Sequence, residues 1–450
     1  MTQKLYIKTY GCQMNTYDSE QISNLLSFHG YALSETPEDA DVVILNTCHI
    51  REKATEKVYS DLGRLKPFKQ RKEAKLEKMI LAVAGCTAQA EGAEIMRRIP
   101  YVDLVLGPQT YHRLPEMLAQ LRRKSSHRQK RRLVETDFPI ESKFDFLPEQ
   151  QTISQGSSAF LTIQEGCDKF CTFCCVPYTR GAEFSRPSSA ILQEARTLIS
   201  KGVQEITLLG QNVNAYHGKG RSDTEEWGLG RLLLEIAEIP NLKRLRYTTS
   251  HPRDVDEELI LAHKNIPILM PFLHLPVQSG SDVILKAMNR GHTSDFYRKI
   301  IDDLRKARPE IAFSSDFIVG FPGETNEDFA QTLKLINDVD FAQAFSFSYS
   351  IRPGTPAGSM SSQISQHEKD ERLQTLQHLV REQQIRFNTL WVNKTTSVLF
   401  DRLGRHDNQY IGRSPYLQPI HVKSPENVLG KILPVKINSI FPNSLEGHLL

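Results

Sequence analysis

The chain has 450 residues, which is too long for one ordinary hydrophobic core and predicts two or three domains. Its hydrophobic content of 39%, charged content of 24% and net charge of +3 are typical of a globular protein, and they permit a nucleic-acid partner without requiring one. Residues 1–8 contain no apolar run of signal-peptide length, and no stretch of the chain approaches the roughly 20 apolar residues of a membrane span, so we expect a cytoplasmic protein with no membrane partner.

The first 122 residues alternate short apolar segments with polar, helix-like segments. Strands are predicted at residues 5–9, 41–45, 79–84 and 102–106. Helices are predicted at residues 19–28, from residue 51, near residues 89–98, and in a segment that ends near residue 121. Such alternation is typical of βαβ units, so we expect an α/β domain with a parallel sheet over residues 1–122.

Residues 123–157 are predicted to be a basic linker. Lysines and arginines gather around its start, at Arg122, Arg123, Lys124, Arg128, Lys130, Arg131 and Arg132. The plainer interpretation is a solvated connector between domains, and an electrostatic contact with RNA is the alternative.

A second α/β domain is predicted over residues 158–382. Its strands are expected at residues 160–163, 205–209, 244–248, 269–275, 313–319 and 341–349. Helical patterns separate them, for example at residues 189–200 and 326–337, and a long charged helix follows at residues 366–386. Six strand–helix units indicate an open or partial (β/α)6 barrel.

The last region, residues 383–450, has shorter strand patterns separated by turn residues. The strands are expected at residues 396–400, 409–412, 420–423 and 432–437. Glycines and a proline lie between or at the ends of these segments, for example Gly404, Pro415 and Gly430. This pattern predicts a small all-β barrel.

Three cysteines of the second domain lie in one loop. Cys167, Cys171 and Cys174, here called the loop cysteines, follow the first predicted strand with the spacing C-x3-C-x2-C. Three thiolates at this spacing can bind three irons of a [4Fe–4S] cube and leave the fourth iron open to a small ligand. A structural zinc site is the alternative, but zinc requires four ligands, and the local fourth thiol, Cys175, directly adjoins Cys174.

Three further cysteines are far apart in sequence but share a position relative to the strands. Cys12, Cys48 and Cys86, here called the strand-end cysteines, each come just after the carboxyl end of a predicted strand. Gly11 and Gly85 immediately precede two of them. In a parallel sheet such ends lie along one edge, so three thiolates can converge there and hold a second cluster. The alternative is three ordinary buried thiols, because free cysteine is among the most buried residue types.

These cysteines and the segments around them resemble the radical-SAM methylthiotransferases, and the resemblance covers nearly the whole chain. In the first domain it rests on residues 10–15 (YGCQMN), 46–48 (NTC) and 84–86 (AGC). In the second domain it rests on the cysteine loop and on residues 177–181 (PYTRG), 209–213 (LGQNV), 274–280 (HLPVQSG), 316–324 (DFIVGFPGE) and 352–357 (RPGTPA). The C-terminal region is similar to the family's TRAM domain, a small RNA-binding β-barrel. His49 and Cys175 depart from the family pattern without removing a ligand.

The resemblance implies an enzyme with two [4Fe–4S] clusters and S-adenosylmethionine (SAM). The loop cysteines would hold the cluster that cleaves SAM to methionine and a 5′-deoxyadenosyl radical. The strand-end cysteines would hold the cluster that carries or donates sulfur, and a second SAM would supply the methyl group. The segments around Cys12 and Cys48 look most like the branch that adds a methylthio group to C2 of N6-isopentenyl (dimethylallyl) adenosine beside the anticodon of tRNA. The implied partners are tRNA and an electron donor such as a flavodoxin or ferredoxin, and a monomer is expected.

Other polar residues near strand ends are candidate contacts. Gly210, Gln211 and Asn212 follow the second barrel strand, and by analogy with the wider superfamily they would contact the amino end of SAM; a plain turn is the alternative. Gln278 and Ser279 follow the fourth strand and are candidates for the adenosyl group or the RNA. Weaker candidates, each with a structural or surface role as the alternative, are His251, Asp316, Arg352, Arg402, Arg405 and Arg413.

Two alternatives of function remain open. The same chemistry on a threonylcarbamoyl-adenosine in tRNA, or on a ribosomal-protein side chain, would need the same cysteines. A non-catalytic, metal-stabilised RNA-binding protein would need only a closed metal site and the C-terminal barrel. Colour and metal content separate these classes, because two iron–sulfur clusters give a brown protein with about eight irons, whereas a zinc protein is colourless.

Overall fold

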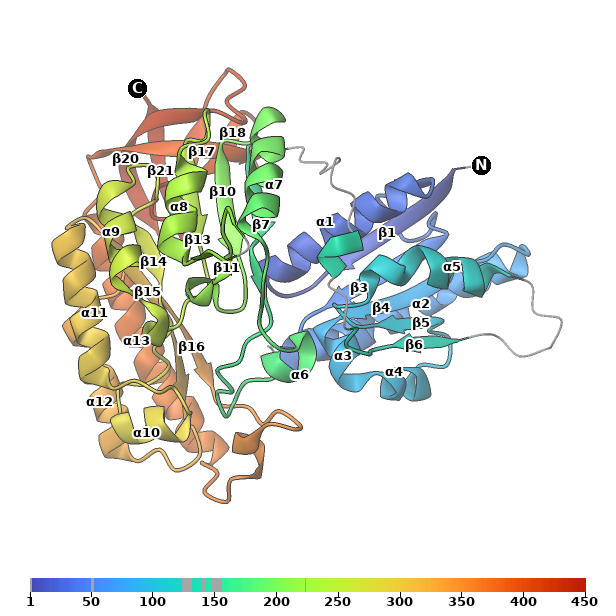
Figure 1. Ribbon diagram of the computed structural model, residues 1–450, viewed down its shortest axis with the longest axis horizontal. Helices are drawn as coiled ribbons and strands as arrows, with labels where there is room; N and C mark the ends of the chain where they lie inside the picture. The colour runs from blue at the N-terminus through green and yellow to red at the C-terminus, as the bar shows by residue number, and fades with distance from the viewer. Residues whose placement is uncertain (1, 50–51, 124–131, 140–142, 147–155, 223) are drawn as a thin grey trace. The chain divides into compact units, whose positions relative to one another are not determined.

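The computed structural model describes the chain except for residues 1, 50–51, 124–131, 140–142, 147–155 and 223. The chain divides into two compact units (Figure 1). Unit 1 comprises residues 1–153, 166–168 and 175–183, and unit 2 comprises residues 154–165, 169–174 and 184–450. Most of the basic stretch that the sequence offers as an RNA contact, residues 124–131, lies outside the described residues.

Unit 1 is built on a six-stranded parallel sheet in the order β2-β1-β3-β4-β5-β6, as predicted for an α/β domain. Its strands are β1 (Gln3–Thr9), β2 (Tyr31–Leu33), β3 (Val42–Thr47), β4 (Ile80–Gly85), β5 (Leu104–Leu106) and β6 (Leu133–Glu135). Its helices are α1 (Gln13–Phe28), α2 (Glu52–Ala74), α3 (Cys86–Glu91), α4 (Ala93–Arg98), α5 (Leu114–Arg122) and α6 (Val176–Arg180).

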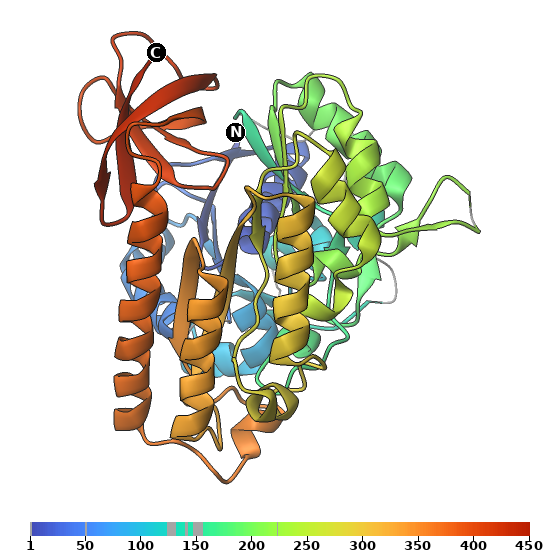
Figure 2. The same cartoon turned by 90° about the vertical axis from the view of Figure 1, so that its left-hand side faces the viewer.

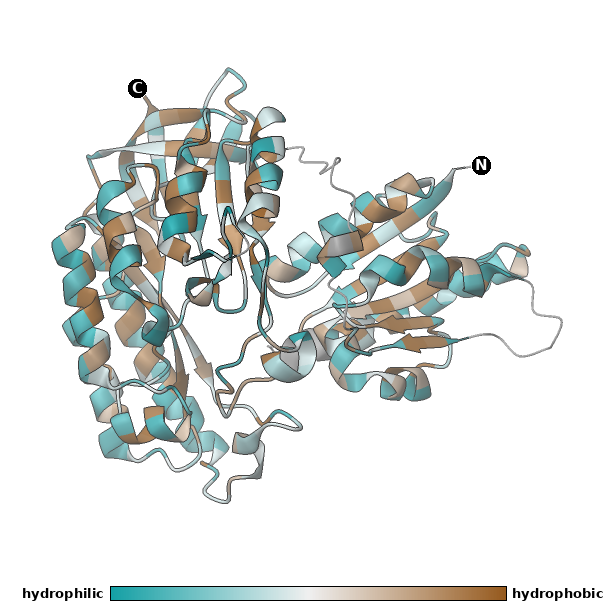
Figure 3. Cartoon of the chain, in the orientation of Figure 1, coloured by the Kyte–Doolittle hydropathy of each residue, from teal (hydrophilic) through white to brown (hydrophobic). Residues whose placement is uncertain are grey.

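Strand β3 shows why helices cover both faces of this sheet. All six of its residues are buried. Val42 and Ile44 pack with side chains of α1 and α5, whereas Val43 and Leu45 pack with side chains of α2, α3 and α4. Because successive strand residues point to opposite faces, a continuous apolar strand needs a cover on each side. Figure 3 shows this pattern as brown strands between helices that carry much of the teal.

The sequence does not predict the two shortest edge strands of unit 1, β2 and β6. β2 and β6 have three residues each and form the two edges of the sheet, so neither is long enough to show a strand period. β6 lies within residues 123–157, so part of the predicted linker is a strand of the sheet. The helix predicted near residues 89–98 is two helices, α3 and α4, which are separated at Gly92.

Unit 2 contains the predicted partial barrel, with all six expected strands. β7 (Ser158–Thr162), β10 (Glu205–Leu209) and β13 (Arg244–Tyr247) pair in parallel in the order β13-β10-β7. β14 (Phe272–His274), β15 (Ala312–Val319) and β16 (Gln343–Ser348) pair in parallel in the order β14-β15-β16. An isolated parallel bridge between Leu245 and Leu269 joins the two sets of strands.

Helices follow these strands and pack against them (Figure 1). They are α7 (Ser188–Ser200), α8 (Leu229–Ala237), α9 (Glu257–Asn265), α10 (Asp282–Ala287), α11 (Ser294–Ala307), α12 (Asn326–Val339) and α13 (Gln366–Thr389). Two short hairpin-like pairs complete this part, β8 (Gln164–Glu165) with β9 (Phe184–Ser185) and β11 (Gly218–Lys219) with β12 (Glu226–Trp227). Among the described residues, no helix combines the length and the apolar character that a bilayer crossing requires.

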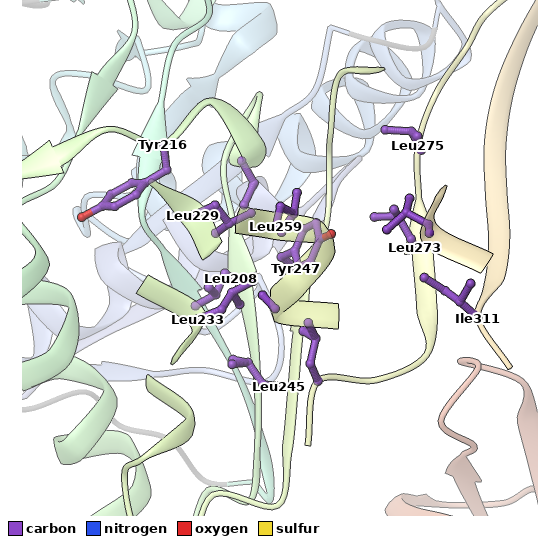
Figure 4. Close-up of a cluster of buried hydrophobic side chains, with 14 of the residues drawn as sticks. Leu208, Tyr216, Leu229, Leu233, Leu245, Tyr247, Leu259, Leu273, Leu275 and Ile311 are labelled. Carbon is purple, nitrogen blue, oxygen red and sulfur yellow. The ribbon is translucent and has the colours of Figure 1, made fainter. Parts of the chain in front are cut away.

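The core of unit 2 lies between the barrel strands and their helices. Figure 4 shows Leu208 of β10 and Tyr247 of β13 among leucines of α8 and α9, such as Leu233 and Leu259. Five of the helices begin at a side chain that accepts a hydrogen bond from the first turn, at Asp256, Ser281, Thr293, Thr325 and Ser365. Each cap satisfies a backbone N–H group that a helix start leaves without a partner.

The C-terminal strands form a closed barrel in the order β17-β18-β19-β21-β20, drawn in red in Figure 2 and consistent with a TRAM domain. They are β17 (Thr395–Leu403), β18 (Gln409–Arg413), β19 (Pro419–Lys423), β20 (Ile432–Phe441) and β21 (Ser444–Leu449), of which β21 is not predicted from the sequence. Arg244 and Arg246 of β13, both beside Glu205, donate to the carbonyls of Ser397 (2.9 Å) and Pro415 (2.7 Å). These buried contacts join this barrel to the partial barrel of unit 2.

Candidate cysteine sites

The strand-end cysteines lie at the carboxyl ends of three neighbouring strands of unit 1. Cys12 follows β1, Cys48 follows β3 and Cys86 follows β4. The strand order reverses between β1 and β3, because β2 lies on the far side of β1. In an open α/β sheet, ligands bind outside the carboxyl ends at such a switch point. The three thiols therefore share the edge of the sheet where a cofactor is expected.

Two glycines let these strand ends come close together. Gly11 has a φ of +102°, and a Cβ atom there would lie 2.6 Å from the Cys48 sulfur. Gly85 has a φ of +89°, and a Cβ atom there would lie 2.4 Å from the carbonyl oxygen of Thr47. Both conformations favour glycine, and any side chain would push the strand ends apart.

Two buried asparagines connect the segments that carry Cys12 and Cys48. The Asn15 amide donates to Asn46 Oδ1 (3.2 Å) and to the Thr47 carbonyl (2.8 Å). The Asn46 amide donates back to the Asn15 carbonyl (2.9 Å), and the Cys12 thiol donates to Asn15 Oδ1 (3.1 Å). A buried amide needs several partners at once, and this network supplies them while it holds the two strand ends in register.

A buried charged group also lies in unit 1. Arg180 of α6 forms an ion pair with Asp18 of α1 (2.6 Å), and Lys143 lies 3.4 Å from the other oxygen of the same carboxylate. All three side chains are at most 2% exposed. Two cations therefore share this carboxylate, and all three side chains are shielded from water.

The thiols respond differently to these surroundings. A hydrogen bond with Cys48 and the positive charge of Arg180 lower the pKa of Cys12 to about 6, against the effect of burial. Burial raises the pKa of Cys86, although the charge of Arg180 opposes the rise. A lowered thiol pKa favours the thiolate, which is the form that binds a metal. Of these two thiols, Cys12 is therefore the one whose surroundings favour the thiolate.

The cysteine loop contributes to both units. Cys167 belongs to unit 1, where its N–H group donates to the Gly181 carbonyl (3.3 Å). Cys171 and Cys174 belong to unit 2, where the Cys174 N–H group donates to the Cys171 carbonyl (2.9 Å) in a tight turn. Cys171 is buried, and the other two are half-buried. Joint ligation by the loop cysteines stays a prediction from their spacing.

The unit 2 part of the loop docks against the end of α10. The Thr172 N–H group donates to the Met288 carbonyl (3.0 Å), and the Thr172 hydroxyl donates to the Ala287 carbonyl (2.9 Å). The Asn289 amide donates to the carbonyls of residues 169 and 170 (3.2 and 3.0 Å). One short segment after α10 therefore holds the backbone of the loop between its first and third cysteines.

Arg290, the next residue along, brings a buried guanidinium to Cys171. Its Nη1 donates to the Cys171 sulfur (3.4 Å), and its Nη2 donates to the Pro276 carbonyl. The side chain is only 5% exposed, and its Nε has no partner among the described residues. Within the same part of the chain, Arg290 forms no ion pair with a carboxylate.

The turn after β10 is held by one glutamine. Gln164 Oε1 accepts hydrogen bonds from the N–H groups of Gln211 (2.9 Å) and Asn212 (3.1 Å). A Cβ atom at Gly210 would lie 2.5 Å from the same oxygen, so the turn needs glycine there for close packing. The three residues predicted to contact SAM thus form a rigid turn, with its backbone N–H groups engaged inside the protein.

The same turn is linked to the cysteine loop by Asp254. The Asn212 amide donates to Asp254 Oδ2 (2.8 Å), and Lys169 of the loop forms an ion pair with the other oxygen (2.7 Å). The Asn212 side-chain oxygen is buried and has no partner in the described part of the chain. This oxygen is the acceptor that the turn leaves for a bound ligand.

Gln278 and Ser279 differ in what their polar atoms do. Gln278 has a φ of +78°, and its buried Oε1 has no partner among the residues described. Ser279 is fully buried, and its hydroxyl lies 3.2 Å from the Thr332 hydroxyl. Because buried polar atoms are normally paired, Gln278 is suited to receive an added ligand, whereas the Ser279 hydroxyl is engaged within the fold.

The weaker candidates of this domain lie in three separate settings. His251 is buried, with Nδ1 accepting from the Arg253 N–H group (3.2 Å) and Nε2 unpartnered within the described residues. Asp316 of β15 is half-buried, 3.6 Å from Nε2 of His274. Arg352 lines an open surface pocket of about 410 Å³ formed by the loop of residues 351–359. The three positions stay candidate ligand contacts. The hydrogen bond of His251 and the ion pair of Asp316 do not involve a cysteine.

The donor chemistry fits iron–sulfur clusters. In the described part of the chain, no three His, Cys, Asp or Glu side chains converge as ligands of a single ion do. In an iron–sulfur cube, by contrast, each thiolate binds a different iron. The strand-end set offers only sulfur, which suits iron–sulfur or soft metals rather than magnesium or calcium.

Several residues of these sites have no assigned role in the sequence analysis: Asp18, Gln164, Asp254 and Arg290. A polar residue just after an apolar strand is a usable signal for Gln164. Arg290 gives no such signal, because its contact with Cys171 joins residues 119 positions apart. Arg180 lies in the PYTRG segment, but only the structure gives it a partner in α1.

Two protein-family models and several solved structures resemble the chain. Residues 4–107 match the uncharacterized protein family UPF0004, and residues 161–336 match the radical SAM superfamily. The radical SAM methyltransferase TsrM from Kitasatospora setae, with cobalamin and a [4Fe–4S] cluster bound, has a TM-score of 0.57 and 14% identity over 80% of this chain and 77% of that chain. The cobalamin-dependent SAM radical enzyme OxsB has a TM-score of 0.50 and 14% identity over 84% of this chain and 56% of that chain.

At such identities the likeness to solved structures shows the fold alone. The family models add the chemistry, because the superfamily that matches residues 161–336 uses SAM and a [4Fe–4S] cluster. The chain is therefore an enzyme with a UPF0004 domain at residues 4–107 and a radical SAM domain at residues 161–336.

Proposed function

We propose that this enzyme is a tRNA methylthiotransferase that adds a methylthio group to C2 of N6-isopentenyl-adenosine next to the anticodon. The observation that carries the proposal is the strand-end set of Cys12, Cys48 and Cys86, a second group of three thiols in a chain with a radical SAM domain. One group of three cysteines suffices to hold the cluster that cleaves SAM. A second group at a ligand-binding edge supports a reaction that also delivers a sulfur atom.

In unit 1, we assign the strand-end cysteines to a second [4Fe–4S] cluster. The low pKa of Cys12 favours the thiolate that such a cluster needs. Asn15 and Asn46 keep the strand ends in place, and Gly11 leaves room beside Cys48. The positive charge of Arg180 favours anionic sulfur close to these thiols.

In unit 2, we assign Cys171 and Cys174, together with Cys167, to the cluster that the radical SAM domain implies. These residues would hold a cluster that supplies one electron for the reductive cleavage of SAM. The chain orients this ligand: the free oxygens of Asn212 and Gln278 are acceptors for the SAM ammonium group and for ribose hydroxyls.

The C-terminal barrel supports an RNA substrate. Arg402 and Arg405 are exposed at the end of β17 and in the connection that follows it. Asp401 lies 3.7 Å from Arg402 and 3.6 Å from Arg413. Exposed arginines on a small barrel suit phosphate contacts, which provide most of the affinity for nucleic acid. A separate one-electron donor, such as a flavodoxin or ferredoxin, completes the proposal.

An anaerobic reaction followed by mass spectrometry of the digested nucleosides tests the proposal. The mixture holds the reconstituted enzyme, isopentenylated tRNA, SAM and a strong reductant, and we expect the 2-methylthio nucleoside together with 5′-deoxyadenosine. Formation of 5′-deoxyadenosine without a modified base would contradict the substrate, and threonylcarbamoylated tRNA and ribosomal proteins would then replace it in the same assay. Absence of both products from protein that holds both clusters would contradict the proposed activity.

A further inference from the structure

Arg290 is a buried cation without a counter-charge in the described part of the chain. Its side chain is 5% exposed. Nη1 donates to the Cys171 sulfur, Nη2 donates to the Pro276 carbonyl, and Nε has no partner among the described residues. A buried charge is costly unless an opposite charge or a full set of hydrogen bonds compensates it. We therefore expect the negative charge that compensates Arg290 to come from a group that is not part of the polypeptide.

The neighbouring titratable groups do not supply the missing negative charge. Burial lowers the pKa of His292 to about 4 and lowers the pKa of His251 strongly, with the charge of Arg290 acting in the same direction. Both imidazoles are consequently neutral at neutral pH. Lys169 and Asp254 balance each other in an ion pair (2.7 Å).

We propose that Arg290 is a positioning residue whose charge and hydrogen bond to Cys171 raise the reduction potential of the cluster held by the loop cysteines. This inference rests on the proposed function, because that function places the cluster at Cys171. A cube held by thiolates is anionic, and the electron that it accepts from the external donor adds one negative charge. A cation at hydrogen-bond distance from a ligand sulfur stabilises the reduced form more than the oxidised form. Arg290 itself exchanges no proton and no electron.

An EPR-monitored redox titration tests this role. The full chain is reconstituted with Cys12, Cys48 and Cys86 all replaced by alanine, so that only the loop cluster reports. We expect Arg290→Gln, which keeps a donor but loses the charge, to lower the ratio of reduced to oxidised cluster about tenfold at a given solution potential, a shift of about 59 mV for one electron. Arg290→Lys should restore most of the shift, because it keeps the charge. Arg298→Gln, the same change at a half-buried ion-paired site on α11, should leave the potential unchanged.

Different outcomes would overturn the role of Arg290 and the placement of the cluster at Cys171. An Arg290→Gln protein with about four irons and an unchanged potential would overturn the role of Arg290. If that variant loses its iron, Arg290→Lys still tests the role of the charge: a tenfold fall in the ratio, although the charge is kept, would overturn it. A Cys171→Ala protein that still holds about four irons in this background would instead overturn the placement of the cluster.

Discussion

The two sets of cysteines reach their sites in opposite ways. The loop cysteines are close in sequence, and their spacing alone indicates one inorganic centre. The strand-end cysteines follow β1, β3 and β4, and only the parallel order of these strands brings them to one edge. The comparison teaches that a parallel sheet can bring cysteines from separate strands to one edge without a local motif.

The two sets also differ in how their arginines are compensated. Arg180 of unit 1 is paired with Asp18, which Lys143 also approaches. Arg290 of unit 2 contacts Cys171 and has no carboxylate partner among the described residues. The charge of Arg180 is therefore balanced by a carboxylate of the protein itself. We propose that the charge of Arg290 is balanced by a group from outside the polypeptide.

The largest effect is expected from the loop site. Cys171→Ala should abolish both 5′-deoxyadenosine and the methylthio product and should reduce the iron content from about eight to about four per chain. Iron analysis and product analysis of the same preparation measure this. The matched control is Cys175→Ala, which removes the adjacent thiol and should keep both clusters and both products. Full production of 5′-deoxyadenosine by Cys171→Ala would show that the loop site does not act as described.

Cys48→Ala should separate the two sites. We expect about four irons per chain, continued formation of 5′-deoxyadenosine and loss of the methylthio nucleoside, because the loop site remains while the strand-end site is broken. Anaerobic assays that quantify both products decide the matter. A methylthio yield close to that of the wild-type enzyme would refute a role of Cys48 in sulfur transfer.

The buried network of unit 1 makes a prediction about stability. Asp18→Asn leaves Arg180 and Lys143 without their shared carboxylate, so we expect the free energy of unfolding to fall by about 3–5 kcal/mol. Guanidinium unfolding of the protein measures this loss. Combining Asp18→Asn with Arg180→Gln should recover part of it, since one of the two cations that shared the carboxylate is then neutral. A loss below about 1 kcal/mol in the single variant would argue against the network.

A moderate effect is expected from the turn after β10. Gln164→Ala removes the side-chain oxygen that accepts from the N–H groups of Gln211 and Asn212. We expect this change to destabilise the turn by about 1–3 kcal/mol. We therefore expect SAM to bind roughly tenfold more weakly, as equilibrium dialysis can show. Gln193→Ala, on the exposed face of α7, is the control and should bind SAM normally. Unchanged affinity in Gln164→Ala would remove this turn from the SAM site.

The smallest effect is expected at the C-terminal barrel. Replacing Arg402 and Arg405 together by glutamine should weaken tRNA binding several-fold and reduce the dependence of the binding constant on salt, by about one unit of slope for each lost phosphate contact. Binding measured over a range of salt concentrations checks both effects. An unchanged slope would place the RNA on another surface of the enzyme.

Most of the fold follows from the sequence, and the reasons for success and failure are physical. Five of the barrel strands have four to eight residues, and the three-residue β14 lies in the longer apolar segment of residues 269–275. Helices between the strands, such as α8 and α11, have one apolar face. β2 and β6 are too short for a periodic signal. β21 (SLEGHL) has only two large apolar side chains, so it also gives a weak strand pattern. β6, which lies after residue 122, completes the sheet of unit 1.

The candidate sites could be predicted only in part. Cysteines can be recognised by type and by position relative to strands, so both sets are visible in the sequence. Their supporting charges are not: Arg290 meets Cys171 across 119 residues, and Arg180 meets Asp18 across 162 residues. Such contacts depend on the packing of distant elements, for which one sequence carries no local pattern.

The most direct test of the account is the amount of each product formed by the wild-type enzyme, Cys48→Ala and Cys171→Ala on isopentenylated tRNA. We expect both 5′-deoxyadenosine and the methylthio nucleoside from the wild type, only 5′-deoxyadenosine from Cys48→Ala, and neither from Cys171→Ala. Methylthio nucleoside from either variant at the wild-type level would contradict the claim that two cysteine sites share one reaction.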